Sequence, residues 1–125
     1  MGIGRALAYA LDQKGANLIL TARNIDPSDF ANHTAISADL TKQEDIEKLL
    51  KESNTHQIDG LFNVAGVGIY KPLEELTVDK LKQSIDLNLI APYALIKGLY
   101  QNLQNSNLSL IMNIGSGAGT MPFKN

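Results

Sequence analysis

Residues 1–20 read Met-Gly-Ile-Gly-Arg-Ala-Leu-Ala-Tyr-Ala-Leu-Asp-Gln-Lys-Gly-Ala-Asn-Leu-Ile-Leu, and they indicate the fold class. Apolar residues recur in it at the spacing of one helical face, and Gly15 stands where a left-handed cap would end the helix. The run Leu18-Ile19-Leu20 is then typical of a strand that is covered on both faces. A helix that begins beside glycines and leads directly into a buried strand indicates an α/β protein.

The rest of the chain alternates in the same way. Residues 23–32 lack periodicity and predict a loop, residues 34–36 predict a second strand, and the capping-box spacing at 41–44 predicts the start of a helix. Further along we expect a strand at 61–64, a helix carrying Val78, Leu81 and Ile85, a break at 88–92, a helix from Pro92 to Leu103, and a strand at 108–114. This order predicts a Rossmann-like doubly wound parallel sheet, with residues 1–125 forming one partial nucleotide-binding domain.

Composition narrows the class of protein. The chain has 125 residues, 44% of them hydrophobic, which suits one globular core. Its net charge of -2 gives no basic excess for binding a nucleic-acid backbone. The absence of cysteine excludes disulfides and thiolate metal sites, and we expect a cytoplasmic protein. We see no secretion signal and no membrane span. His33 and His56 lack partners at ligand spacing, so we expect surface residues and no metal site.

Gly2-Ile3-Gly4 opens the first helix. Free backbone N–H groups and the positive end of the helix dipole attract phosphate at such a place, and glycine allows close approach. Taken alone, the three residues fit an ordinary glycine-rich helix start equally well.

Arg23 follows the first predicted strand at its carboxyl end, where α/β sheets bind nucleotides. The position that would hold an acidic residue for a ribose 2′-hydroxyl is occupied by Ala22. A guanidinium suits the additional 2′-phosphate of NADP, although a solvated loop arginine is the alternative. Asp39 follows the next strand and is expected either to accept a hydrogen bond from adenine or simply to precede the helix cap at Thr41.

Together these motifs resemble those of the classical short-chain dehydrogenase/reductase (SDR) family. The resemblance covers essentially the whole chain, because the motifs occur in the family's order and spacing. They are Gly-Ile-Gly at 2–4, Asp39-Leu40, Asn63-Val64-Ala65-Gly66, Asn88, and Asn113-Ile114-Gly115-Ser116.

The resemblance implies a cofactor site, with NADP as the expected cofactor and NAD as the other possibility. Gly2, Ile3 and Gly4 would meet the pyrophosphate. Arg23 and Asn24 would meet the adenosine ribose. The residues expected around the adenine and beside the ribose are Asp39, Leu40, Asn63, Ala65 and Gly66.

The resemblance also implies two catalytic residues. Ser116 corresponds to the serine that polarises the substrate carbonyl, and Asn88 to the asparagine that holds a water in the proton relay through a local distortion of the helix. Tyr93 and Lys97 match the spacing of the family's catalytic tyrosine and lysine, but they precede Ser116. We therefore interpret them as a packing tyrosine and a surface lysine.

By the family's spacing, the catalytic tyrosine would follow Asn125 and the first strand would precede Met1. We therefore expect a fragment that lacks the first, central strand and the C-terminal strands. Its remaining strands should form two separate pairs with open apolar edges, which predicts marginal stability and association.

The expected parent protein is an oxidoreductase that interconverts a small alcohol and a carbonyl compound by hydride transfer. The family implies a homo-oligomer, a dimer or a tetramer, for this parent. We expect the fragment itself to be inactive. The alternative is a non-catalytic dinucleotide-binding sensor or partner subunit.

Overall fold

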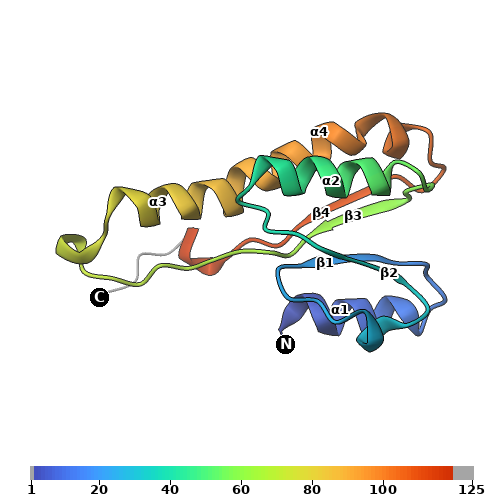
Figure 1. Cartoon of the computed structure of the whole chain (residues 1–125), viewed down its shortest axis with the longest axis horizontal. Coiled ribbons are helices and arrows are strands. Elements are labelled where there is room, and N and C mark those ends of the chain that lie inside the picture. The colour runs from blue at the N-terminus through green and yellow to red at the C-terminus, as the bar shows by residue number, and fades with distance from the viewer. Residues whose placement is uncertain (1, 120–125) are drawn as a thin grey trace. The chain divides into compact units, whose positions relative to one another are not determined.

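The computed structural model describes residues 2–119 (Figure 1). Met1, near which the first helix was expected to begin, lies outside these residues. The helices and strands in chain order are α1 (Ile3–Asp12), β1 (Ile19–Ala22), β2 (Thr34–Ser37), α2 (Gln43–Ser53), β3 (Gly60–Asn63), α3 (Val78–Ile85), α4 (Ala91–Gln104) and β4 (Leu110–Asn113).

The chain forms two compact units, Met1–His56 and Gln57–Asn125. The first unit holds a parallel pair of strands, β1 and β2, in register from Ile19 with Thr34 to Ala22 with Ser37. The second unit holds the parallel pair β3 and β4. The expectation of two separate strand pairs is therefore confirmed for the residues described.

In the first unit, α1 buries Ala8 and ends before Gly15, whose φ of 80° confirms the expected left-handed residue. Glycine suits this position because a Cβ would be strained there. β1 lies one residue later than predicted at its start. The connection from β1 to β2 was expected to be a plain loop, but it contains a 3-10 helix, Pro27–Phe30.

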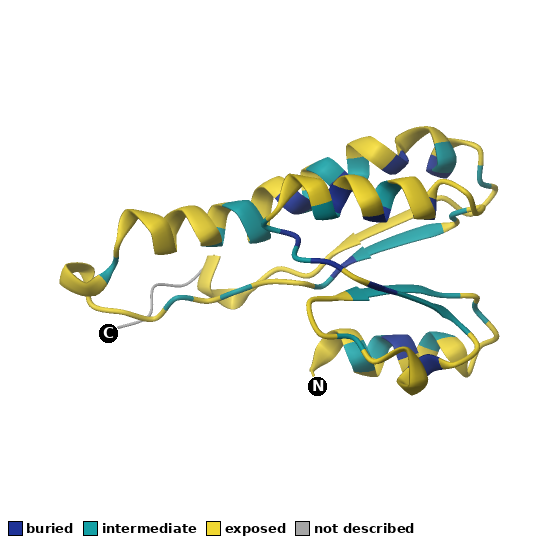
Figure 2. Cartoon of the chain, viewed as in Figure 1, coloured by how far each residue is buried: buried dark blue, intermediate teal, exposed yellow. Residues whose placement is uncertain are grey.

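In the second unit, α4 contacts both β3 and β4. Its buried residues Leu95, Leu99 and Leu103 follow one another at four-residue spacing, so they share one face of the helix. The side chain of Asn102 accepts a hydrogen bond of 2.8 Å from the amide of Ile58, just before β3. Figure 2 shows these buried positions on α4, whereas no residue of α3 is buried.

The predicted break at 88–92 is wrong. A π-helix, Asp86–Ile90, joins α3 directly to α4, and the amide of Ala91 donates to the carbonyl of Asp86 five residues earlier. Pro92 lies at the start of α4, where the missing amide is tolerated. Proline in the middle of an apolar helical pattern suggested an interruption, but the wider turn accommodates it.

The capping box predicted at residues 41–44 is also wrong. The N-cap of α2 is Lys42, and its side chain makes no capping hydrogen bond. The Thr41 hydroxyl donates to Asp39 Oδ1 at 2.8 Å instead. The Thr41 hydroxyl therefore bonds to the Asp39 carboxylate and does not cap α2.

His33 is not the surface residue that the sequence suggested. Its side chain is only 7% exposed, and its Nε2 lies 2.9 Å from Asp12 Oδ1. The amide of Leu18 donates to its Nδ1. Asp12 is distant from His33 in sequence, so a search for nearby ligand spacing could not find this partner. His56, in contrast, has a side chain that is 46% exposed, as expected.

Candidate functional site

The N-terminus of α1 carries the residues predicted to meet a pyrophosphate. Gly2 is exposed with a φ of 122°, and a Cβ built on it would meet nothing within 4 Å. No side chain among residues 2–119 caps this helix, and its first turn holds no Asp or Glu. The first-turn amides and the positive helix end are therefore not taken by an anion of the chain itself. These features fit a bound phosphate.

Arg23 and Asn24 lie just beyond the carboxyl end of β1, and both are exposed. The hydroxyl of Ser37, the last residue of β2, donates to the carbonyl of Arg23 at 2.7 Å. This bond ties the ends of the two parallel strands together. It leaves the guanidinium of Arg23 on the exposed edge where a nucleotide ribose was predicted.

Asp39 lies at the same edge of the first sheet. Its Oδ1 accepts hydrogen bonds from the hydroxyl and the amide of Thr41, and these two bonds lower the pKa of its carboxyl group. The positive charges of Arg23 and Lys42 lower this pKa further. The Asp39 amide donates to Asp45 Oδ2 at 2.7 Å. The charge of Arg23 thus acts on the Asp39 carboxyl group, together with that of Lys42.

The neighbouring residue Leu40 is buried, unlike the other predicted adenine and ribose contacts of this unit. The sequence analysis missed the contributions of Ser37, Thr41 and Asp45. The Asp-Leu-Thr spacing at 39–41 is a signal for the turn, because an Asp side chain commonly bonds the amide two residues later. Nothing in the local sequence indicates the Ser37 bond, which joins different strands.

In the second unit, Asn63 ends β3 and is buried. Its Nδ2 donates to Asn113 Oδ1 at 2.8 Å, and its carbonyl accepts from the amide of Ile114 at 2.9 Å. These bonds fix the carboxyl ends of β3 and β4 side by side. Ala65 and Gly66 follow β3 and are both exposed.

The side chain of Asn88 projects from the π-helix to the segment after β3. Its Oδ1 accepts from the amide of Val67 at 2.9 Å, and its Nδ2 donates to the Val67 carbonyl at 2.8 Å. Nδ2 also lies 3.1 Å from Ser84 Oγ. A Cβ on Gly66 would come within 3.2 Å of Asn88 Oδ1, so a small residue is needed there.

The backbone carbonyl of Asn88 has a separate property. Its regular α-helical donor would be the amide four residues later, and that residue is Pro92, which has none. Pro92, four residues after Asn88, is therefore a sequence signal for the local distortion of the helix that was expected at Asn88, and the π-helix Asp86–Ile90 is such a distortion.

Ser116 follows β4 in an exposed turn. Its Oγ accepts a hydrogen bond of 3.2 Å from the amide of Ala118, and its carbonyl accepts from the amide of Gly119. Tyr93 is 62% exposed and Lys97 is exposed on α4, four residues apart.

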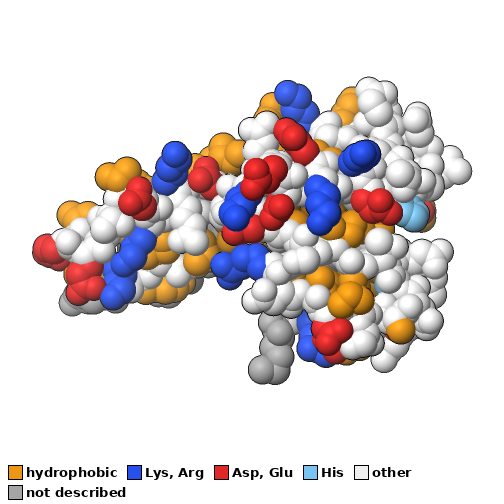
Figure 3. All heavy atoms as spheres, viewed as in Figure 1, with side chains coloured by type: hydrophobic (Ala, Val, Ile, Leu, Met, Phe, Trp, Pro, Cys, Tyr) orange, Lys and Arg blue, Asp and Glu red, His pale blue; other side chains and the backbone are white. Residues whose placement is uncertain are grey.

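Charged side chains of both signs lie on the surface of the chain. On the face shown in Figure 3, basic and acidic side chains are interspersed. Residues 2–119 contain no group of three or more His, Asp or Glu side chains placed to hold a metal ion. In the same residues no helix has the length and apolar character needed to cross a membrane.

The parallel strand pairs, with an open helix N-terminus and polar groups after the strands, define a Rossmann-like α/β protein. The sequence model described as short chain dehydrogenase matches residues 1–125. The chain belongs to this family of oxidoreductases. The resemblance inferred from the motifs is thereby confirmed.

Individual relatives agree with this assignment. The chain is 32% identical to a 3-oxoacyl-[acyl-carrier-protein] reductase of Vibrio harveyi, over 96% of this chain and 52% of the relative. A short-chain dehydrogenase from Sphingobium yanoikuyae, solved in complex with NADPH, is similar with a TM-score of 0.86 and 26% identity, covering 97% of this chain and 52% of that chain.

A 4-hydroxyisoleucine dehydrogenase complexed with NADH and succinate is similar with a TM-score of 0.88 and 28% identity, covering 98% of this chain and 58% of that chain. Similar proteins thus bind either nucleotide. The chain spans about half the length of the curated relatives that it matches.

Proposed function

We propose that this chain is the nucleotide-binding portion of an NADP(H)-preferring short-chain dehydrogenase/reductase. Its parent protein would interconvert an alcohol and a ketone or aldehyde. The bound cofactor would supply or accept the hydride. The chain's own residues would bind and orient that cofactor and stabilise charge on the substrate oxygen.

The observation that carries the NADP preference is Arg23 at the carboxyl end of β1, next to Ala22. A carboxylate there would bind the 2′-hydroxyl of NAD and repel the 2′-phosphate of NADP, whereas a guanidinium attracts phosphate. Asn24 would assist at the same ribose, and Asp39 and Leu40 would contact the adenine. The uncapped amides at Gly2, Ile3 and Gly4 would hold the pyrophosphate.

In the second unit, Ser116 and Asn88 would take part in the chemical step. The Ser116 hydroxyl would donate a hydrogen bond to the substrate oxygen as negative charge develops on it. The Asn88 carbonyl, which Pro92 leaves without its usual donor, would accept from a water that carries protons. Asn63, Ala65 and Gly66 would leave room for the cofactor beside the end of β3.

Binding of the two nucleotides tests the cofactor assignment. We expect the purified chain to bind NADPH more tightly than NADH, as measured by nucleotide fluorescence, and Arg23→Ala to remove most of this preference by about 1.5–3 kcal/mol. Lys14→Ala is the matched control, because it removes a cation of the first unit away from β1. Tighter binding of NADH that persists in Arg23→Ala would refute the assignment.

We also propose that the 125-residue chain has no reductase activity by itself, because residues 117–125 contain no tyrosine to serve as the acid. NADPH oxidation in the presence of small ketones and aldehydes measures this directly. Turnover by the purified chain would contradict the proposal. Binding without turnover in the full parent protein would instead favour a non-catalytic dinucleotide sensor or partner subunit.

Two further features belong to the same proposal. The exposed Tyr93 and Lys97 on α4 suit a helix that packs against a second subunit, so we expect a homodimer or homotetramer for the parent. The lack of cysteine suits a reducing, cytoplasmic location.

A further inference from the structure

The connection between β1 and β2, residues 23–33, is here named the crossover strap. Parallel strands are usually joined by a crossover that contains an α-helix. The strap holds only the 3-10 helix Pro27–Phe30, which the Asp26 side chain caps at the amide of Ser28. A segment with so little internal structure depends on contacts outside itself for a fixed position.

One face of α1 supplies these contacts. Arg5, Tyr9 and Asp12 are spaced by four and three residues, so they lie on the same side of the helix. Arg5 Nη2 lies 3.2 Å from Asp29 Oδ1. The Tyr9 and Phe30 rings have centroids 5.0 Å apart. Asp12 holds His33 at the far end of the strap.

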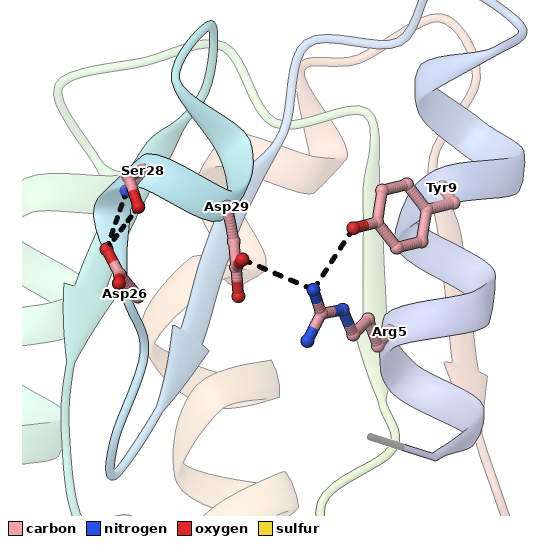
Figure 4. Close-up of polar contacts among 5 residues, drawn as sticks. All are labelled: Arg5, Tyr9, Asp26, Ser28 and Asp29. Carbon is pink, nitrogen blue, oxygen red and sulfur yellow. Dashed lines mark hydrogen bonds and ion pairs between the residues drawn. The ribbon is translucent and has the colours of Figure 1, made fainter.

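Arg5 lies between Asp29 and Tyr9 in this arrangement (Figure 4). Its Nη2 also lies 3.2 Å from the Tyr9 hydroxyl, and its guanidinium stands 5.7 Å from the centre of the Tyr9 ring. The hydrogen bond with Tyr9 and the charge of Asp29 raise the pKa of Arg5. The guanidinium points to Asp29 of the strap.

The strap begins with Arg23 and Asn24, the residues assigned to the ribose. Its start is held by the bond from Ser37 to the Arg23 carbonyl, and its middle by the Arg5–Asp29 pair. Pairing between guanidinium and phosphate depends on geometry, and ordering a loose segment costs affinity at the moment of binding. A strap already fixed on α1 avoids that cost.

We propose that Arg5 and Asp29 are positioning residues that set the preference for a 2′-phosphorylated nucleotide by fixing the strap. This inference rests on the proposed function and extends it to residues that need not touch the cofactor. It predicts that loosening the strap weakens NADPH binding more than NADH binding, because NADH makes no contact with Arg23 through a 2′-phosphate.

Asp29→Ala separates positioning from simple electrostatics. Removing a negative charge from the strap that carries Arg23 would by itself favour the 2′-phosphate and raise the ratio of NADH to NADPH dissociation constants. Positioning instead lowers this ratio by about two- to fivefold, the range expected for an exposed ion pair. Arg5→Ala should lower the ratio by a similar factor. Arg5→Lys keeps the positive charge, so its ratio should stay close to that of the unmodified chain.

The double variant Arg5→Ala with Asp29→Ala should lower the ratio no further than either single variant, because both remove the same pair. Glu47→Ala is the matched control, since it removes a carboxylate of the first unit from α2 and not from the strap. Amide hydrogen exchange in the nucleotide-free chain supplies a second readout. The amide of His33, which donates to the Phe30 carbonyl, should exchange faster in Asp29→Ala and at the original rate in Glu47→Ala.

The outcomes are distinguishable. If the unmodified chain shows no preference for NADPH, the proposed cofactor assignment fails, and with it the basis of this inference. If the preference exists but Asp29→Ala leaves it unchanged or increases it, the positioning role alone is refuted. Unchanged exchange at His33 in Asp29→Ala would refute the fixed strap whatever the nucleotide result.

Discussion

The neighbours of Asp39 control the charge of this residue, which is proposed to contact the adenine. The Thr41 hydroxyl and amide donate to its carboxylate and lower its pKa, with the charge of Arg23 adding to the effect. A lowered pKa in the folded state means that the ionised form stabilises the fold. This contribution is present above the ordinary Asp pKa of about 3.9 and is lost as the pH falls through the lower folded value.

We therefore expect Thr41→Val to raise the Asp39 pKa, because the variant removes the hydroxyl bond and keeps the amide. Titration of the Asp39 carboxyl carbon by nuclear magnetic resonance measures this. Thr55→Val is the control, since the Thr55 hydroxyl donates to the backbone carbonyl of Glu52 and not to a carboxylate. An Asp39 pKa that is the same in both variants would show that the hydroxyl has no such effect.

At the scale of elements, periodicity alone predicted the order of helices and parallel strands. α4 follows from its apolar spacing, because its buried residues share one face, and β2 follows from a short apolar run that ends in the buried Ile36. The details that failed depend on contacts between residues that pattern analysis treats separately. Thr41 was expected to cap α2 but bonds to Asp39, and Pro92 was expected near a break but follows a π-helix.

The candidate site was likewise predicted in its residues and not in the contacts that support them. Motif order indicated Asn88 and Ser116, because the family spaces them characteristically, and Arg23 was indicated by its place after a predicted strand. The supporting contacts could not be predicted, since Asn88 reaches Val67 and Ser37 reaches the Arg23 carbonyl across different elements. His33 was misjudged for the same reason.

The contact of Asn88 in the π-helix with Val67 after β3 leads to a prediction about stability. Gly66→Ala should lower the free energy of unfolding by about 1–2 kcal/mol, because Asn88 Oδ1 is held by Val67 and cannot withdraw freely from the new methyl group. Urea denaturation measures this. Gly115→Ala is the matched control, since its Cβ would meet nothing within 4 Å. Equal stability of the two variants would contradict the close packing of Gly66 against Asn88.

At the scale of the whole molecule, each unit carries its own parallel strand pair and its own set of proposed functional residues. The first unit has an uncapped α1 and the cation Arg23, which suit phosphates. The second has Asn88 and Ser116, which suit chemistry at a carbonyl. Because the chain spans about half of its curated relatives, the activity of the parent rests on the full protein, whereas nucleotide binding can be tested on this chain.

The most direct test of the central claim is a titration of the isotopically labelled 125-residue chain with NADPH, followed through its backbone amide resonances. We expect saturable shifts that are largest at Gly4, Arg23 and Asp39 and small at Asn105, at the end of α4. An absence of saturable shifts, or shifts confined to residues remote from Gly4, Arg23 and Asp39, would contradict a nucleotide-binding role for this chain.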